Sequence, residues 1–420
     1  MKGLYLFGII TSATIIIGSC AKDGVAQNKT SAIEFNTYIG RDAQTKATSS
    51  GKEESVGSNY TFGGIEMTLG ELQKTGFGVS AVYTGQKTWT VWDNTTTEVS
   101  PNFMFKQKVY YDGGWKYEPV KYWPTMQNDK ISFFAYAPFA TDNNIYGFGR
   151  SDVWTAQHYS LKFAIHDKPE NMVDFVAAAE MDKSWNEGQN NNVVTFNFSH
   201  ALTRLLFSAK TSENMESNSH VVITGARLVK GPYYYKTGIY YFTQKRNTAG
   251  TNDSYWGPTK GQNDQIPSDY DLSGILASST GKVASKTYDK AVIDLTTATS
   301  KPLFKKKGDG ENAPQQYLFL IPTSDSEANP GIPANSAAVA FDYDIVTEDS
   351  SLAAGYSCTS ATKIVYLPAG IMQKGKAYNI TFTFNVDKIE VAAEVTGWDD
   401  ADKDGNINVP FTPDDVTTVI

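Results

Sequence analysis

Hydrophobic and polar residues alternate along most of the chain, which is the pattern of β-strands with one buried face. In "YNITFTFNV", Ile380, Phe382, Phe384 and Val386 share one face, and polar side chains share the other. "KISFFAYAPF", "QQYLFLIPT" and "AAVAFDYDIV" are further strand candidates, separated by clusters of Gly, Asn, Asp and Ser. Only short pieces such as "MVDFVAAAEM" and "TLGELQKTG" could form a helical turn. The pattern predicts an all-β protein made of antiparallel sandwiches.

The first twenty residues have a different pattern. Lys2 precedes an apolar run from Leu4 to Ile17, which is too short to span a bilayer and predicts a secretion signal. The run ends in "IGSC", which looks like a lipobox, so we expect Cys20 to be lipidated and to become the mature N-terminus. The alternative is a signal peptide with an incidental cysteine. No second long apolar run follows, so we do not expect the mature chain to cross a membrane.

Composition and charge narrow the class of protein. The 420 residues suffice for two or three domains, and 40% of them are hydrophobic, enough for a sizeable core. The net charge of -8 argues against a nucleic-acid partner, which selects basic surfaces. The two cysteines are Cys20 and Cys358, so lipidation of Cys20 would leave no intrachain disulfide.

The polar segment "DKSWNEGQNNN", residues 182–192, is the best candidate for a linker between two halves of the chain. Two further polar loops, residues 243–271 and 305–316, interrupt the second half. The sequence shows no fixed-period repeat.

No set of residues in the sequence predicts an enzyme. The four histidines, His158, His166, His200 and His220, lack metal-ligand or triad spacing, and His200 falls on the apolar face of its strand as a core histidine would. Nucleophile-elbow, zinc-protease and phosphate-loop motifs are absent from the sequence. We therefore expect no catalytic residues and no cofactor.

One acidic motif resembles the start of a calcium loop. Asp400, Asp402 and Asp404 with the following glycine match its first positions, but Phe411 stands where a bidentate Glu belongs. We favour a solvated turn and expect no metal site.

Aromatic residues are dense in "KVYYDGGWKYEPVKYWP" and "KGPYYYKTGIYYF". Such rings could form platforms for stacking sugars, but β-sandwiches use the same residues for cross-strand packing. We favour the packing interpretation.

Several segments together resemble the fimbrillin family of Bacteroidales, the pilins of type V pili. The ordered set is "IEFNTYIGRDAQTKAT", "NFMFKQKVYYDGGWKYEPVKYWP", "DKISFFAYAPF", "VTFNFSHALTRLLFSAK" and "YNITFTFNVDKIEVAAEVTGWDD". The resemblance covers about residues 33–400 and implies two transthyretin-like β-sandwich domains in tandem. The expected divisions are a signal peptide (1–19), a lipidated propeptide (20–46), two domains (47–188 and 189–405) and a tail (406–420).

The resemblance also implies a use for the first strand. Family pilins reach the outer membrane as lipoproteins, and a trypsin-like surface protease removes this strand. The open groove is then filled by the tail of another subunit, which is β-augmentation. Here Ile33, Phe35 and Ile39 share the face expected to fill the groove. Cleavage after Arg41 or after Lys46 would release the strand, and the sequence does not decide between them.

The C-terminal "NINVPFTPDDVTTVI" alternates as a donor strand should. The inward candidates are Ile407, Val409, Phe411, Val416, Thr418 and Ile420. Pro410 and Pro413 cannot donate to a strand ladder, so a donor here must be interrupted or edge-like around them. The alternative is an edge strand of the second domain.

Two further functions compete with a pilin subunit that polymerises with other subunits. One is a surface glycan-binding lipoprotein or a pilus anchor that does not polymerise, and the other is an enzyme. Retention of Cys20 on the mature protein would favour the first, whereas loss of residues up to Arg41 or Lys46 would favour a polymerising subunit.

Overall fold

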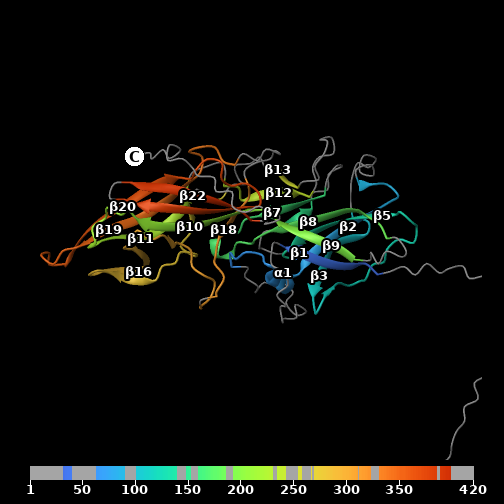
Figure 1. Cartoon of the computed structure of the whole chain (residues 1–420), viewed down its shortest axis with the longest axis horizontal. Helices are drawn as coiled ribbons and strands as arrows, with labels where there is room; N and C mark the ends of the chain where they lie inside the picture. The colour runs from blue at the N-terminus through green and yellow to red at the C-terminus, as the bar shows by residue number, and fades with distance from the viewer. Residues whose placement is uncertain are drawn as a thin grey trace, which may run out of the picture.

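The computed structural model describes residues 32–39, 63–89, 101–139, 148–152, 159–185, 193–229, 234–242, 254–257, 266, 269–310, 312–322, 331–385 and 388–398. These residues form strands β1 to β22, one short α-helix and one 3₁₀-helix, η1 (Pro169–Asn171). The all-β prediction is confirmed. Figure 1 shows an elongated molecule with the N-terminal strands at one end and the strands of the C-terminal half at the other.

A seven-stranded sheet forms the N-terminal end of the molecule, in the order β1-β9-β8-β5-β2-β3-β4. Its strands are β1 (Glu34–Ile39), β9 (Val193–His200), β8 (Val176–Lys183), β5 (Lys130–Ala137), β2 (Phe77–Gly85), β3 (Met104–Tyr111) and β4 (Trp115–Lys116). One face of this sheet packs on a four-stranded sheet, where Phe134 of β5 lies 4.9 Å from the ring of Tyr159. That sheet contains β13 (Tyr255–Gly257), β12 (Thr237–Tyr241), β7 (Ser160–Ala164) and β6 (Phe148–Asp152).

Two more sheets form the C-terminal end. A five-stranded sheet holds β17 (Lys301–Pro302), β10 (Thr203–Thr211), β21 (Lys376–Phe384), β22 (Ile389–Gly397) and β18 (Leu318–Leu320). A six-stranded sheet holds β15 (Thr280–Val283), β16 (Lys286–Leu295), β11 (Ser219–Val229), β19 (Ala338–Glu348), β20 (Tyr356–Tyr366) and β14 (Asp269–Asp271). Phe341 of β19 and Phe382 of β21 meet with ring centroids 4.7 Å apart, so the two sheets pack face to face.

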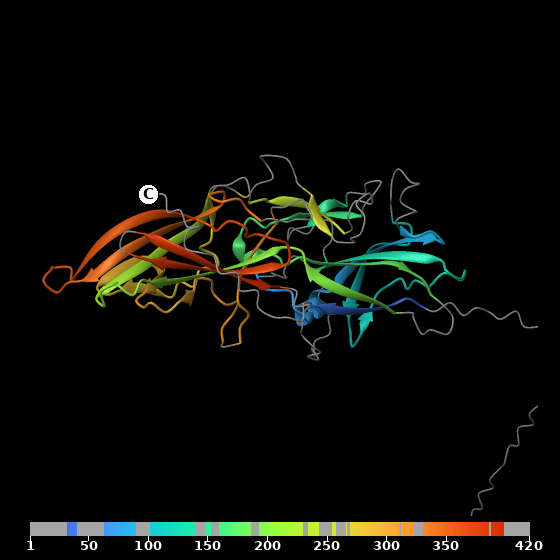
Figure 2. The same cartoon turned by 45° about the horizontal axis from the view of Figure 1, so that its top comes forward.

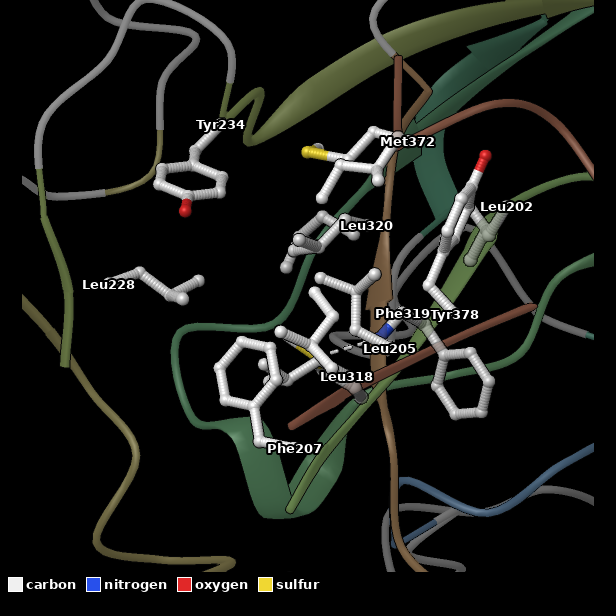
Figure 3. Close-up of a cluster of buried hydrophobic side chains, with 14 of the residues drawn as sticks. Leu202, Leu205, Phe207, Leu228, Tyr234, Leu318, Phe319, Leu320, Met372 and Tyr378 are labelled. Carbon is white, nitrogen blue, oxygen red and sulfur yellow. Dashed lines mark hydrogen bonds between the residues drawn. The ribbon is translucent and has the colours of Figure 1, made fainter. Parts of the chain in front are cut away.

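Buried apolar side chains join the two ends. The largest core runs from Phe134 and Tyr136 of the seven-stranded sheet to Phe341 and Phe382 of the C-terminal sheets. Figure 3 shows part of it, with Leu205 and Phe207 of β10 among Leu318, Phe319 and Leu320. Further side chains of this group are Leu202, Leu228, Tyr234, Met372 and Tyr378. A second core lies on the other face of the seven-stranded sheet, around Phe77, Phe133 and Phe196.

The sheets cross the expected boundary at residue 188. β9 follows that boundary but pairs with β1 and β8 of the N-terminal sheet, and the four-stranded sheet draws β6 and β7 from one side and β12 and β13 from the other. The segment expected to be a linker, residues 182–192, covers the end of β8 and the connection to β9, its neighbour in the same sheet. Polar residues of this kind suit a connection between two strands as well as a linker between domains. The chain enters the C-terminal sheets at Ala201 and Leu202, between β9 and β10.

Two strand pairs are parallel, β1 with β9 and β10 with β21. These pairs depart from the antiparallel prediction. Alternation along one strand indicates which face is buried, but it does not reveal the direction of the neighbouring strand. The segment "MVDFVAAAEM", which could have held a helical turn, holds none, because residues 176–183 form β8. The tandem division into two transthyretin-like domains stays a prediction.

The predicted helical turn in "TLGELQKTG" is confirmed as helix α1 (Leu69–Thr75). The Thr68 hydroxyl accepts a hydrogen bond from the Glu71 amide and caps its first turn. Gly76 ends the helix with a φ of 68°, and a Cβ there would lie 2.5 Å from the Val109 carbonyl oxygen. Leu72 is buried in the second core, so the helix covers part of it.

Candidate assembly site at strand β1

Strand β1 is an edge strand of the seven-stranded sheet and also contacts the segment that follows β4, the strand at the other edge. On one side it pairs with β9, with Phe35 opposite Val194 and Ile39 opposite Phe198. On the other side the Ile33 amide donates to the Lys121 carbonyl oxygen at 2.9 Å. We call the position of β1 between β9 and residues 117–122 the β1 slot. Figure 2 shows β1, in dark blue, running along one side of the N-terminal sheet.

The inward side chains of β1 belong to the second core. Ile33, Phe35 and Ile39 are only 2%, 6% and 3% exposed, whereas Glu34 and Tyr38 on the opposite face are exposed. Each of the three buried apolar side chains is worth roughly 1.5–3 kcal/mol relative to exposure in water. β1 is therefore a core strand, although it is short and lies at a sheet edge.

Phe35 is the centre of an aromatic cluster. Its ring centroid lies 5.1 Å from that of Tyr117, 5.5 Å from Phe196, 6.0 Å from Phe133 and 6.3 Å from Phe77. These neighbours come from four other parts of the sheet, so they would still line the slot without β1. A slot of this kind presents an apolar floor and unpaired main-chain groups, which suit an incoming strand.

Tyr117 holds the free edge of β1. Its hydroxyl donates to the Ile33 carbonyl oxygen at 2.9 Å and accepts from the Lys121 amide at 3.2 Å. Burial raises the pKa of the Tyr117 hydroxyl, so this group stays a proton donor at neutral pH. Ala32 also forms a bridge with Tyr122. The sequence gives no sign of these contacts, because Tyr117 lies 84 residues from Ile33 along the chain.

Thr37 is a polar residue on the inward side of β1. Its Oγ1 atom is buried and has no hydrogen-bond partner among the described residues. An unsatisfied buried hydroxyl costs about 1–3 kcal/mol. At Thr37, therefore, β1 leaves a buried hydroxyl group that the slot does not satisfy.

The other residues expected at the site lie outside the described residues. These are Cys20, Arg41 and Lys46 in the N-terminal segment, and Ile407, Val409, Phe411, Val416, Thr418 and Ile420 in the tail. The acidic motif at Asp400, Asp402 and Asp404 lies outside them too.

A polar cluster lies where the two ends of the molecule meet. The Nδ1 atom of His200 is 2.9 Å from Oδ2 of Asp174, and the His200 ring stacks on Trp398 with centroids 4.1 Å apart. The Trp398 indole donates to Glu66, which also pairs with Arg204. His200 is thus a buried, satisfied histidine as expected, and Trp398 fixes the chain just before the tail.

Other chemistry is sparse in the described part of the chain. There, no group of three or more His, Cys, Asp or Glu could hold a metal ion, and no described helix is long and apolar enough to cross a membrane. Of the eleven described rings in the two aromatic segments, five are buried and five are partly buried; the buried ones are Tyr117, Trp123, Tyr234, Tyr240 and Phe242. This favours the packing interpretation over a sugar platform, although Tyr122 is exposed.

A solved structure and a protein-family model are similar to this chain. A fimbrial protein from Bacteroides vulgatus shares it with a TM-score of 0.67 at 21% identity, over 87% of this chain and 99% of that one. A family model for fimbrillin-like proteins matches residues 80–398, and the chain belongs to this family.

Two further solved structures are similar at lower TM-scores. Putative cell adhesion proteins from Bacteroides uniformis and Parabacteroides distasonis have TM-scores of 0.37 and 0.42 at 12% and 10% identity. Each similarity covers 88% of this chain, and 99% and 96% of those chains, respectively. No curated protein matches the chain.

Proposed function

We propose that the chain is a structural and adhesive subunit of a fimbria, assembled with other subunits by exchange of strand β1 for a donor strand. The observation that carries the proposal is the β1 slot. Strand β1 and Ile33 just before it supply three buried side chains to the core, and the basic residues Arg41 and Lys46 follow within seven residues of Ile39. Membership of the fimbrillin-like family supports the same function.

In this proposal the chain is exported as a lipoprotein through Cys20 and reaches the outer surface with β1 in place. A trypsin-like protease cuts after Arg41 or Lys46, and β1 leaves the slot. Phe77, Phe133 and Phe196 then face water, which is unfavourable for large aromatic surfaces. A strand from another subunit relieves this cost by burying them again and pairing with β9.

The proposed donor is the C-terminal tail. Its apolar residues recur at every second position, as do the inward residues of β1. Ile407, Val409 and Phe411 form one such run, and Val416, Thr418 and Ile420 form another. The proline at 410 would have to face away from a ladder hydrogen bond.

The test is removal of both proposed cleavage sites. In Arg41→Gln/Lys46→Gln, we expect surface protein that keeps β1 and stays monomeric, because its slot remains filled. N-terminal sequencing and gels of unheated samples measure the two results. Lys29→Gln is the matched control, because cleavage before β1 would not release it, and this variant should assemble normally. High-molecular-weight ladders from double-variant protein that still carries residues 33–39 would overturn the proposal.

Lipidation is tested separately with Cys20→Ala. We expect loss of the acyl group and of surface delivery, because the lipobox cysteine is the proposed acceptor. Mass spectrometry of the parent and surface labelling of the variant give the measurement. A parent without an acyl chain, together with normal display of the variant, would remove the lipoprotein step but leave the strand-exchange step intact.

A further inference from the structure

Exposed apolar side chains gather at one end of the seven-stranded sheet. Large hydrophobic residues that are clearly exposed number eight among the described residues, and five of them lie at the end where β1 begins. We call these five the apolar rim: Phe105, Val120, Tyr122, Met126 and Val193. Their exposed fractions run from 41% to 61%. Single exposed apolar residues need no explanation, but a cluster marks an interaction surface.

Strand pairing places the rim at this end. Val193 lies opposite Glu34 at the start of β9, and Tyr122 bridges Ala32 just before β1. Phe105 is at the start of β3, and Met126 accepts a hydrogen bond from Asp129 just before β5 begins. The rim residues thus lie at the end of the seven-stranded sheet where β1 begins, and this end of the sheet is the outer end of the molecule in Figure 1.

The chain's own tail leaves from the opposite end of the slot. Trp398 stacks on His200, which lies two residues beyond Phe198, the partner of Ile39. A tail filling the slot of its own subunit would therefore enter at the Ile39 end and run antiparallel to β9. A tail from another copy can instead enter directly at the rim, and the body of that copy then lies against the rim.

We propose that the apolar rim docks the body of a second copy of this chain, whose tail enters the slot at the Ile33 end and runs parallel to β9. This inference rests on the proposed function and adds the direction of the donor strand and the surface that receives its subunit. A parallel donor repeats the register that β1 makes with β9 and presents alternate side chains to the same floor.

The length of the tail fits this arrangement. At least 22 residues, 399–420, follow Trp398. Fully extended they would span roughly 70 Å, whereas a six-residue strand such as β1 needs about 20 Å. The tail therefore has residues to spare for the path from one subunit to the rim of the next.

Disulfide trapping in assembled fimbriae tests the direction, in a Cys358→Ser parent. Asn406→Cys marks the start of the donor, and Tyr122→Cys marks the rim. Lys116→Cys marks the opposite end of the slot, because strand pairing through β3, β2, β5 and β8 places Lys116 at the same end of the sheet as Ser199. We expect oxidation to join Asn406→Cys to Tyr122→Cys between copies and not to Lys116→Cys. Cross-links to Lys116→Cys, or within one chain, would overturn the inference while leaving strand exchange in place. Failure of the Cys358→Ser parent to assemble through its tail would overturn both.

The docking role of the rim has its own measurement. Tyr122→Ser/Met126→Ser should lower the yield of fimbrial ladders about tenfold or more, because apolar contacts at an interface carry much of its affinity. Ile364→Ser is the matched control, since Ile364 is exposed on β20 far from the rim, and it should assemble like the parent. Equal yields from all three proteins would show that the rim does not dock a second copy.

Discussion

At the scale of single residues, the inward face of β1 combines a strong anchor with a weak point. Phe35 touches four aromatic rings, whereas the hydroxyl of Thr37 is buried without a partner among the described residues. In the proposed exchange, β1 needs enough apolar contact to hold the precursor folded and must still be able to leave. The burial and the mismatch of β1 together fit a temporary occupant.

Thr37→Val should stabilise the unprocessed protein by about 1 kcal/mol, because it removes an unsatisfied hydroxyl and keeps the shape of the side chain. Denaturant unfolding of the precursor measures this change. Thr37→Ser is the control, since it keeps the hydroxyl and loses a methyl group, and it should destabilise. A valine variant less stable than the parent would mean that the hydroxyl has a stabilising partner.

Phe35→Ala should destabilise the unprocessed protein by roughly 3–5 kcal/mol, the usual cost of removing a buried phenylalanine. The same substitution should leave processed, assembled protein unchanged, because β1 is then absent. Unfolding curves of the precursor and of the fimbriae compare the two states. Tyr38→Ala, on the exposed face of the same strand, should change neither. A loss of fimbrial stability in the Phe35 variant would place β1 in the final assembly.

At the scale of secondary-structure elements, alternation predicted the strands but not their partners. Residues 194–200 lie in β9 and residues 380–384 lie in β21 as their patterns indicate, with Phe196 and Phe382 buried. The parallel pairing of β1 with β9, and the support from Tyr117, depend on contacts between distant segments that no local pattern encodes. β8 shows the same limit, because its alanine-rich sequence favours a helix while its place between β5 and β9 makes it a strand.

The six-stranded sheet carries an acid-sensitive pair. Burial opposes ionisation of Asp344, but hydrogen bonds from Lys286, Ser360 and Tyr288 outweigh it and lower the pKa of this carboxyl group. Lys286 donates to Asp344 Oδ2 at 2.6 Å and joins β16 to β19. Because the folded-state pKa is lowered, the stabilisation is present above the unfolded value, near 3.9, and is lost as pH falls through the folded value.

Asp344→Asn should therefore lower the melting temperature at neutral pH and reduce its fall in acid. Melting curves between neutral and strongly acidic pH measure both effects. Asp289→Asn, an exposed residue on β16, is the control and should leave the pH profile unchanged. An Asp344→Asn profile parallel to that of the parent would mean that the pair adds no pH-dependent stability.

At the scale of the whole molecule, the slot and the tail root are separate parts of one continuous body. At one end, β1 contributes Phe35 and Ile39 to the second core. At the junction between β9 and β10, Trp398 stacks on His200. Phe341 of β19 and Phe382 and Phe384 of β21 are buried in the largest core among other described residues of the C-terminal sheets. In the proposed assembly this core belongs to the subunit itself, while the tail serves another subunit.

Deletion of Val416–Ile420 separates the two roles proposed for the tail. If this segment fills a neighbour's slot, each buried Val or Ile contributes roughly 1.5–3 kcal/mol at the contact, and the main-chain ladder adds more. The truncated protein should then melt like the parent monomer and fail to polymerise. Val416→Asp/Ile420→Asp should behave in the same way, because a charge in an apolar slot is costly. An edge strand of its own domain would give the opposite result, a lower melting temperature with polymerisation retained, because the lost contacts would belong to the monomer. Melting curves of the truncated monomer, run beside polymerisation gels, therefore distinguish a tail that serves the next subunit from one that completes its own fold.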